Sequence, residues 1–150
     1  MHNHSPKNYK CPFCLLELNQ NDQYTVYQDK DIKAFISNRE WPPNSGVVLI
    51  IPNQHFENLY DMPDKLLSKI HIFSKNMAKV MKKAYKSDGI LIRQHNEPSG
   101  NQTVFHYHVQ VVPRYDNDRF YGNYENSGRT ISDKDRAKYA KLIKKHFHGK

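Results

Sequence analysis

The segment His106-Tyr-His-Val-Gln110 carries the densest set of side chains that could do chemistry. Side chains alternate between the two faces of a β-strand, so His106, His108 and Gln110 would share one face, about 6–7 Å apart. The opposite face would then be wholly apolar apart from one tyrosine ring. This pattern favours a functional strand face, although a solvent-exposed strand with incidental histidines would show the same alternation.

The loop before this segment, residues 96–103, is rich in polar hydrogen-bonding groups. Its amides, hydroxyls and flexible backbone could cradle phosphate oxygens. Two aromatic residues, Phe13 and Phe35, could form a pocket for a nucleotide base, and a role in the core suits them equally well.

A second set of residues has the composition of a metal site. Cys11 and Cys14 form a C-x-x-C pair, and His55 and His106 would complete a Cys₂His₂ set, which is a common tetrahedral zinc composition. The alternative is two buried thiols and two unrelated imidazoles. A disulfide is not expected in a reducing compartment, and no thioredoxin-like context indicates a redox pair. A zinc ion here would be structural, because no coordination position stays open.

Composition narrows the class of protein. A chain of 150 residues with 37% hydrophobic and 12% aromatic residues is a single folded domain, not a disordered chain. No apolar run is long enough for a membrane helix, and the N-terminus does not resemble a signal peptide, so the cytoplasm is the default location. The net charge of +8 favours anionic partners. Because much of that charge lies on two lysine-rich helices, we do not expect nucleic acid to be the main partner.

Hydrophobic periodicity predicts the elements that must position these groups. Strands are expected at residues 24–27, 31–36, 47–51, 89–94 and 104–112, with Pro113 ending the last of them. Helices are expected at 64–86, with Gly89 suited to the end, and from Ser132 to about Phe147. This order predicts an α+β fold, an antiparallel sheet of about five strands with helices on one face. We expect an N-terminal arm (1–10), a main domain (11–115), and a connection with a C-terminal helix (116–150).

Several stretches, in this order and spacing, resemble the histidine-triad superfamily. They cover about residues 11 to 120 and are Cys11-Pro-Phe-Cys14, Ala34-Phe-Ile36, Pro43-x-x-Gly46, Val48-Leu-Ile-Ile-Pro52-x-x-His55-x-x-Asn58-Leu59 and Gly100-Asn-Gln-Thr-Val-Phe-His106-Tyr-His108-Val-Gln110-Val-Val-Pro113-Arg114.

The resemblance implies an enzyme that acts on nucleoside phosphates, and a homodimer whose paired protomers extend the sheet. It implies that His108 attacks the α-phosphate and forms a nucleotidyl-histidine. Gln102 and Thr103 match positions that contact phosphate or the leaving group, and Asn96 matches a loop asparagine. Many bacterial members hold zinc with residues equivalent to Cys11, Cys14, His55 and His106, so the resemblance also implies a structural zinc ion.

The chain departs from the family pattern at four positions. Gln110 replaces the third histidine, as in the galactose-1-phosphate uridylyltransferase and diadenosine tetraphosphate phosphorylase branch. A glutamine orients phosphate but does not shuttle protons. Ser37 stands where most members have an aspartate that binds ribose, Val47 where many have a histidine, and Asn101 where a glycine is usual.

Three functions therefore compete. The first is a nucleotide hydrolase or nucleotidyltransferase that passes through a nucleotidyl-His108 intermediate, with substrates like dinucleoside polyphosphates. The second is a non-catalytic nucleotide-binding or regulatory module, motivated by Ser37, Val47 and Gln110. The third, motivated by the positive charge, is a protein that processes nucleic-acid ends.

Overall fold

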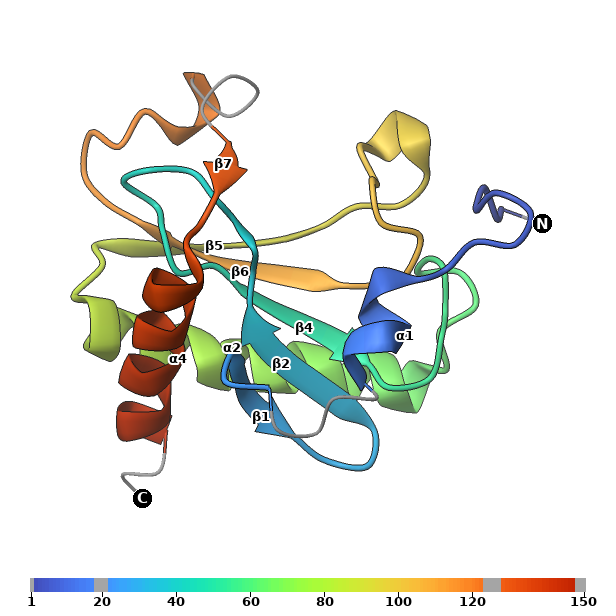
Figure 1. Ribbon diagram of the computed structural model, residues 1–150, viewed down its shortest axis with the longest axis horizontal. Coiled ribbons are helices and arrows are strands. Elements are labelled where there is room, and N and C mark those ends of the chain that lie inside the picture. Colours follow the sequence, from blue (N-terminus) through green and yellow to red (C-terminus); the bar gives the residue numbers. More distant parts are fainter. Residues whose placement is uncertain (1, 18–21, 123–127, 148–150) are drawn as a thin grey trace.

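A five-stranded antiparallel sheet forms the centre of the molecule, with strand order β1-β2-β4-β6-β5 (Figure 1). The computed structural model describes residues 2–17, 22–122 and 128–147. The sheet strands are β1 (Thr25–Gln28), β2 (Ile32–Ile36), β4 (Val48–Pro52), β5 (Gly89–Gln94) and β6 (Val109–Arg114). The expected α+β class is confirmed.

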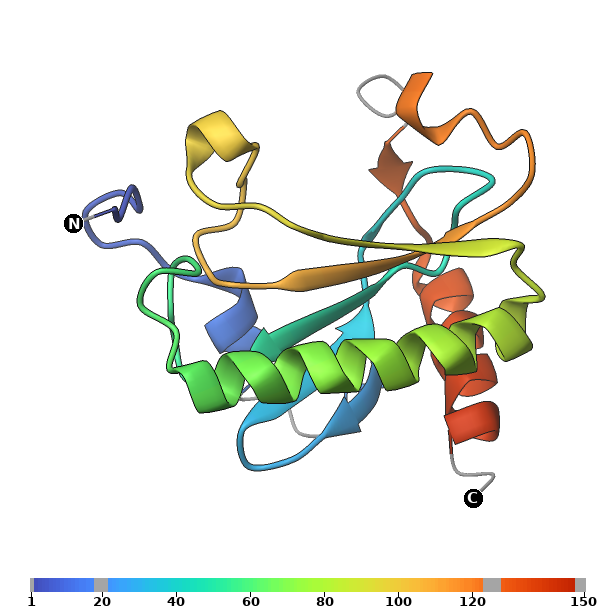
Figure 2. The same ribbon diagram turned by 180° about the vertical axis from the view of Figure 1, so that it is seen from behind.

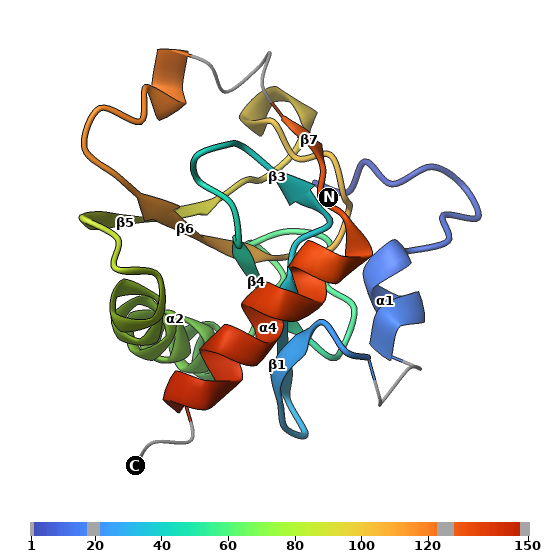
Figure 3. The ribbon, with the colours of Figure 1, turned by 60° about the vertical axis from the view of Figure 1, so that its left-hand side comes forward.

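Two helices pack on one face of this sheet, as the sequence predicts. They are α2 (Asp64–Tyr85), which runs along the sheet in Figure 2, and α4 (Asp133–Phe147), which lies beside it in Figure 3. A hydroxyl at the start of α4 caps that helix: Ser132 accepts a hydrogen bond from the backbone N–H of Asp135 at 3.1 Å. The core under both helices contains the following buried side chains: Ile32, Ala34, Ile36, Val48, Ile50, Ile70, Met77, Met81, Tyr107, Val109, Val111, Ala140 and Ile143.

The other face of the sheet is covered by a short N-terminal helix, α1 (Pro12–Glu17). Side chains alternate along β2 and β4, so Phe35 and Leu49 point to this face and pack in a second core with Phe13 of α1. This second core holds α1 against the same sheet face that carries the polar residues described below.

A small two-stranded sheet was not predicted. It pairs β3 (Arg39–Glu40) with β7 (Arg129–Thr130), and Arg129 Nε donates to Glu40 Oε1 at 2.8 Å. β7 lies in the stretch that the sequence predicts to be a connection before the C-terminal helix. Two-residue strands have no readable period, so only the folded chain reveals this pairing.

The boundaries of two elements differ from the prediction. Helix α2 ends at Tyr85, where Lys86 takes a left-handed conformation at φ 53°, so the helix stops before Gly89. Strand β6 runs through Pro113 to Arg114 and begins only at Val109, not at residue 104.

The late start of β6 follows from its neighbours. The β4 ladder with β6 reaches only as far as Ile50 paired with Val109, and Pro52 at the end of β4 has no N–H to continue the ladder. Tyr107 instead donates its backbone N–H to the carbonyl of Phe56 at 2.6 Å. The segment that contains His106 and His108 therefore leads into the strand, so the prediction that it lies within a strand was wrong.

Within the described residues, no helix is both long and apolar enough to cross a membrane.

Candidate active site and metal centre

A cavity of about 670 Å³ opens on the sheet face that carries α1. It brings together side chains from α1, from the segment after β2, from the loop between β5 and β6, and from β6 itself. The residues that line it include Phe13, Phe35, Ser37, Arg39, Trp41, His95, Asn101, Thr103, His108, Gln110 and Arg136. His108 and Gln110 therefore share one face and one cavity, as the sequence predicts.

The imidazole of His108 is oriented by the backbone carbonyl two residues before it. Its Nδ1 lies 2.8 Å from the carbonyl oxygen of His106, so Nδ1 carries the proton and donates it, which leaves the lone pair on Nε2. Burial lowers the pKa of His108 to about 4, although the hydrogen bond to the carbonyl opposes this shift. The ring is therefore neutral near pH 7 and is suited to attack an electrophile through Nε2.

Gln110 is fixed by a residue that sequence reasoning missed. Arg93 on β5 donates from Nε to Gln110 Oε1 at 2.6 Å, which turns the amide nitrogen toward His108 Nε2 at 3.4 Å. The guanidinium of Arg93 lies 5.1 Å from the ring centre of Trp41 and 5.3 Å from that of Phe120. The available signal was a lone arginine inside the apolar run of β5.

The four predicted metal ligands converge in the structure. Cys11 Sγ and Cys14 Sγ lie 3.3 Å and 3.6 Å from His106 Nδ1, and Cys14 Sγ lies 3.3 Å from His55 Nδ1. All four ligand atoms lie within 4.8 Å of one another. Ideal tetrahedral zinc with sulfur and nitrogen ligands would place these atoms about 3.5 Å apart, so the donor set fits the ion in both chemistry and spacing.

His106 is prepared as a ligand by its surroundings. Its Nε2 lies 3.0 Å from the Pro52 carbonyl, which holds the N–H on that nitrogen and points the lone pair of Nδ1 at the cysteines. Burial lowers the pKa of His106 to about 4, so the ring is neutral, as a metal ligand must be.

Phe13 and Phe35, the residues predicted to form a base pocket, pack against each other beside His108. The ring of Phe13 lies edge-on to Phe35 at 5.5 Å and to His108 at 5.3 Å between ring centres. Thr103 also lines the cavity. Ser37 lines it too, with its hydroxyl oxygen accepting the backbone N–H of Arg39 at 3.0 Å.

Asn96 and Gln102 do not line the cavity. The side-chain oxygen of Asn96 accepts the backbone N–H of Leu59 at 2.8 Å. Gln102 is buried, where Nε2 donates to the Glu57 carbonyl at 2.5 Å and Oε1 accepts the N–H of Glu97 at 2.7 Å. Both amides hold loop backbone in this structure, and their assignment as phosphate contacts stays a prediction. Val47 is buried in the second core.

The charge of the cavity is one-sided. Among the described residues that line it, Arg39 and Arg136 are cationic and none is acidic. A low-dielectric cavity with fixed positive charges and imidazole nitrogens favours a polyanionic ligand.

Comparisons with known proteins agree with one another. The family model described as "HIT domain" matches residues 19–117. An uncharacterized HIT-like protein of Borreliella burgdorferi is 33% identical over 114 residues, which cover 75% of this chain and 81% of that protein. An adenosine 5′-monophosphoramidase of Saccharomyces cerevisiae is 30% identical over 71% of this chain and 63% of its own length. A zinc-bound histidine triad family protein of Mycobacterium smegmatis has the same fold, with a TM-score of 0.76 and 23% identity over 92% of this chain and 93% of that one.

Proposed function

Because the chain belongs to the HIT-domain family, we propose that it is an enzyme of nucleoside phosphates that forms a covalent nucleotidyl-His108 intermediate. The observation that carries the proposal is the hydrogen bond from His108 Nδ1 to the His106 carbonyl, which leaves a neutral, buried Nε2 facing the cavity. The named activity of the yeast relative, a nucleoside phosphoramidase, is the same class of chemistry.

The cavity suggests how such a substrate would lie. The base would lie beside Phe13, which Phe35 supports from the core, and the α-phosphate would lie near His108 Nε2. The amide of Gln110, held by Arg93, would donate a hydrogen bond to a phosphate oxygen as charge develops on it. His108 Nε2 would then bond to phosphorus as the bond to the leaving group breaks.

The acceptor that releases the nucleotide from His108 is water, inorganic phosphate or a sugar phosphate. Gln110 does not titrate near pH 7, which is the feature that the chain shares with transferases of the superfamily. Substrates resembling dinucleoside polyphosphates suit the volume and the positive charge of the cavity.

We further propose a structural zinc ion held by Cys11, Cys14, His55 and His106. The ion would supply no chemistry to the substrate, since four protein ligands fill its coordination. It would link the N-terminal segment to the residue two positions before His108, and so help to hold the nucleophile in place.

The edge strand β5 is the surface proposed for a homodimer. It pairs with β6 on one side only, and Ile92 within it is 42% exposed. Pairing β5 with the same strand of a second copy would extend the sheet across both protomers. Light scattering should then report twice the mass of the 17.7 kDa chain, and Ile92→Lys should shift it toward the monomer.

The experiment that tests the enzyme is chemical trapping. The purified protein is incubated with a panel of α-³²P-labelled nucleotides and dinucleoside polyphosphates, with and without inorganic phosphate, and is then denatured. An acid-labile label on the His108 peptide supports the enzyme, and nucleoside diphosphate released only with phosphate present would identify transfer. Nucleotide binding with neither label nor product would instead support a non-catalytic nucleotide-binding module, and His108→Ala is the blank.

A further inference from the structure

A second histidine, His95, lies opposite the proposed nucleophile. The register of β5 with β6 pairs Arg93 with Gln110 and Gln94 with Val109. Both strands end at that second pair, and His95 and His108 are the next residues along the two chain segments. Both imidazoles line the cavity, from neighbouring chain segments.

The ring of His95 has one nitrogen anchored and one unused. Its Nδ1 lies 2.7 Å from the carbonyl oxygen of Gly100, so Nδ1 carries a proton and donates it. Its Nε2 is buried and has no hydrogen-bond partner among the described residues. A buried polar atom left without a partner costs free energy, which a ligand that hydrogen-bonds to it would recover.

The proposed reaction needs a proton at this place. When His108 Nε2 bonds to phosphorus, the electron pair of the breaking P–O or P–N bond goes to the leaving group, which must be protonated unless it is a stable anion. His108 cannot provide that proton, because its Nδ1–H stays on the His106 carbonyl. Gln110, Arg39 and Arg136 do not exchange protons near neutral pH.

We propose that His95 is the general acid and base of this site, an inference that rests on the proposed function. In the first half-reaction the imidazolium form, with a proton on each nitrogen, gives its Nε2 proton to the leaving atom as the bond to phosphorus breaks, and His95 becomes neutral with its proton on Nδ1. In the second half-reaction the neutral Nε2 takes a proton from the acceptor hydroxyl, as the acceptor oxygen bonds to phosphorus and the His108 N–P bond breaks. The cycle returns the proton to His95, and it makes water a competent acceptor although Gln110 replaces the third histidine.

The ionisable side chains that line the cavity with His95 are His108, Arg39 and Arg136. Along its own segment Arg93 lies two residues before it, and Glu97, two residues after it, bonds His4 and Tyr60 and does not line the cavity. Since no carboxylate lines this cavity among the described residues, His95 is the side chain that can exchange a proton with the leaving group there.

Leaving-group dependence tests the role. The probes are the 4-nitrophenyl and phenyl esters of AMP, because nitrophenolate departs as a stable anion whereas phenol, with a pKa of about 10, benefits from protonation. His95→Gln retains a donor for the Gly100 carbonyl but cannot titrate. We expect it to slow labelling of His108 by the phenyl ester on the order of 100-fold, and labelling by the nitrophenyl ester by about threefold or less.

A matched control and a rescue protect the result from a folding artefact. His146 lies on α4, outside the cavity, and its Nδ1 bonds the Leu142 carbonyl of the same helix at 3.0 Å, so His146→Gln should leave both rates unchanged. In His95→Ala, added imidazole should restore part of the rate with the phenyl ester and leave the rate with the nitrophenyl ester unaffected.

Two results would overturn the inference, and they are distinguishable. If the wild-type protein labels His108 but His95→Gln slows both esters equally, His95 is not the acid and the proposed function stands. If neither ester labels His108 in the wild-type protein, the proposed function itself fails.

Discussion

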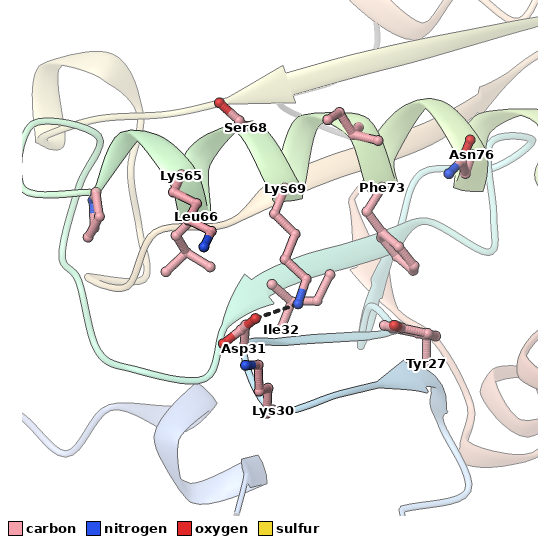
Figure 4. A pocket seen from close by; sticks show the side chains of 12 residues that line it. Tyr27, Lys30, Asp31, Ile32, Lys65, Leu66, Ser68, Lys69, Phe73 and Asn76 are labelled. Carbon is pink, nitrogen blue, oxygen red and sulfur yellow. Dashed lines mark hydrogen bonds and ion pairs between the residues drawn. The ribbon is translucent and has the colours of Figure 1, made fainter.

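Two cavities formed by described residues differ in their suitability for chemistry, and the one with the greater volume is the poorer candidate. A groove of about 870 Å³ lies between the first half of α2 and the β1–β2 turn, with Leu66 and Phe73 in its wall (Figure 4). Its central cation is already neutralised, because Lys69 reaches across to Asp31 at 2.5 Å and to Asp29 at 2.8 Å. No histidine or cysteine lines it, among the residues that the structure describes.

The cavity of His108 differs in how its polar atoms are used. There His108 and His95 each donate from Nδ1 to a backbone carbonyl, and Arg93 donates to Gln110. These bonds fix one side of three polar side chains that line the cavity. In the α2 groove Lys69 is paired with Asp29 and Asp31, and Tyr27 donates its hydroxyl to Asp29 at 2.9 Å. A candidate site is therefore identified better by polar atoms that are held in place beside a cavity than by the volume of that cavity.

The largest effect should come from removing the nucleophile. His108→Ala is expected to lower turnover of the substrate found by trapping by at least about 1,000-fold, because no other group in the cavity would form the covalent bond. Nucleotide affinity by calorimetry should change little. Full activity in this variant would show that the His108 cavity is no better a candidate site than the α2 groove.

Loss of the proposed zinc ion should have the next largest effect, and on stability. Cys14→Ser is expected to abolish bound zinc in elemental analysis and to lower the free energy of unfolding by about 3 kcal/mol, or Tm by roughly 6–12 °C. His146→Gln, on α4 and outside the metal ligand set, should retain both. The proposed zinc site would be contradicted if neither the wild-type protein nor Cys14→Ser held zinc and both had the same Tm.

The contact between Arg93 and Gln110 should have a smaller effect. Arg93→Met frees the Gln110 amide to rotate, so we expect kcat to fall about tenfold, with Gln110→Ala causing a similar loss. If Arg93 acts through Gln110, the double variant should lose no more than the single ones, as a double-mutant cycle would show. Strictly additive losses would mean that Arg93 acts independently.

The smallest effect is expected in the α2 groove. Lys69→Met should leave kcat/KM unchanged and cost about 1 kcal/mol of stability or less, since its ion pairs are partly exposed. Any marked loss of activity would show that this groove takes part in function.

The same variant should alter the acid limb of stability. Partial burial would raise the pKa of Asp29, but hydrogen bonds from Lys69, from the backbone of Asp31 and Ile32, and from Tyr27 outweigh it and lower the pKa well below its usual range. A carboxyl whose pKa is lower in the folded state stabilises the fold when the pH is above its unfolded pKa of about 3.9. That contribution is lost as the pH falls from there toward the folded pKa. Denaturant titrations from about pH 5 to about pH 2 should show a smaller loss of unfolding free energy in Lys69→Met than in wild type.

Local patterns in the sequence were enough to predict much of the fold. The apolar stripe of α2, the strand at Gly89–Gln94 and the start of α4 after Ser132 depend on periodicity and capping within one segment, so they were readable before folding. Residue composition and the family resemblance also indicated four candidate metal ligands, whose donor atoms lie within 4.8 Å of one another in the fold.

Only the tertiary structure decided which polar groups face the cavity. Arg93 beside Gln110 and His95 across from His108 depend on the register between β5 and β6, and Gln102 turns toward the Glu57 carbonyl because the loop packs there. Register and loop packing join residues far apart in the chain, and no local period encodes such contacts. The residue types that could do chemistry were therefore visible in the sequence, whereas the fold determined which of their atoms are left free to do it.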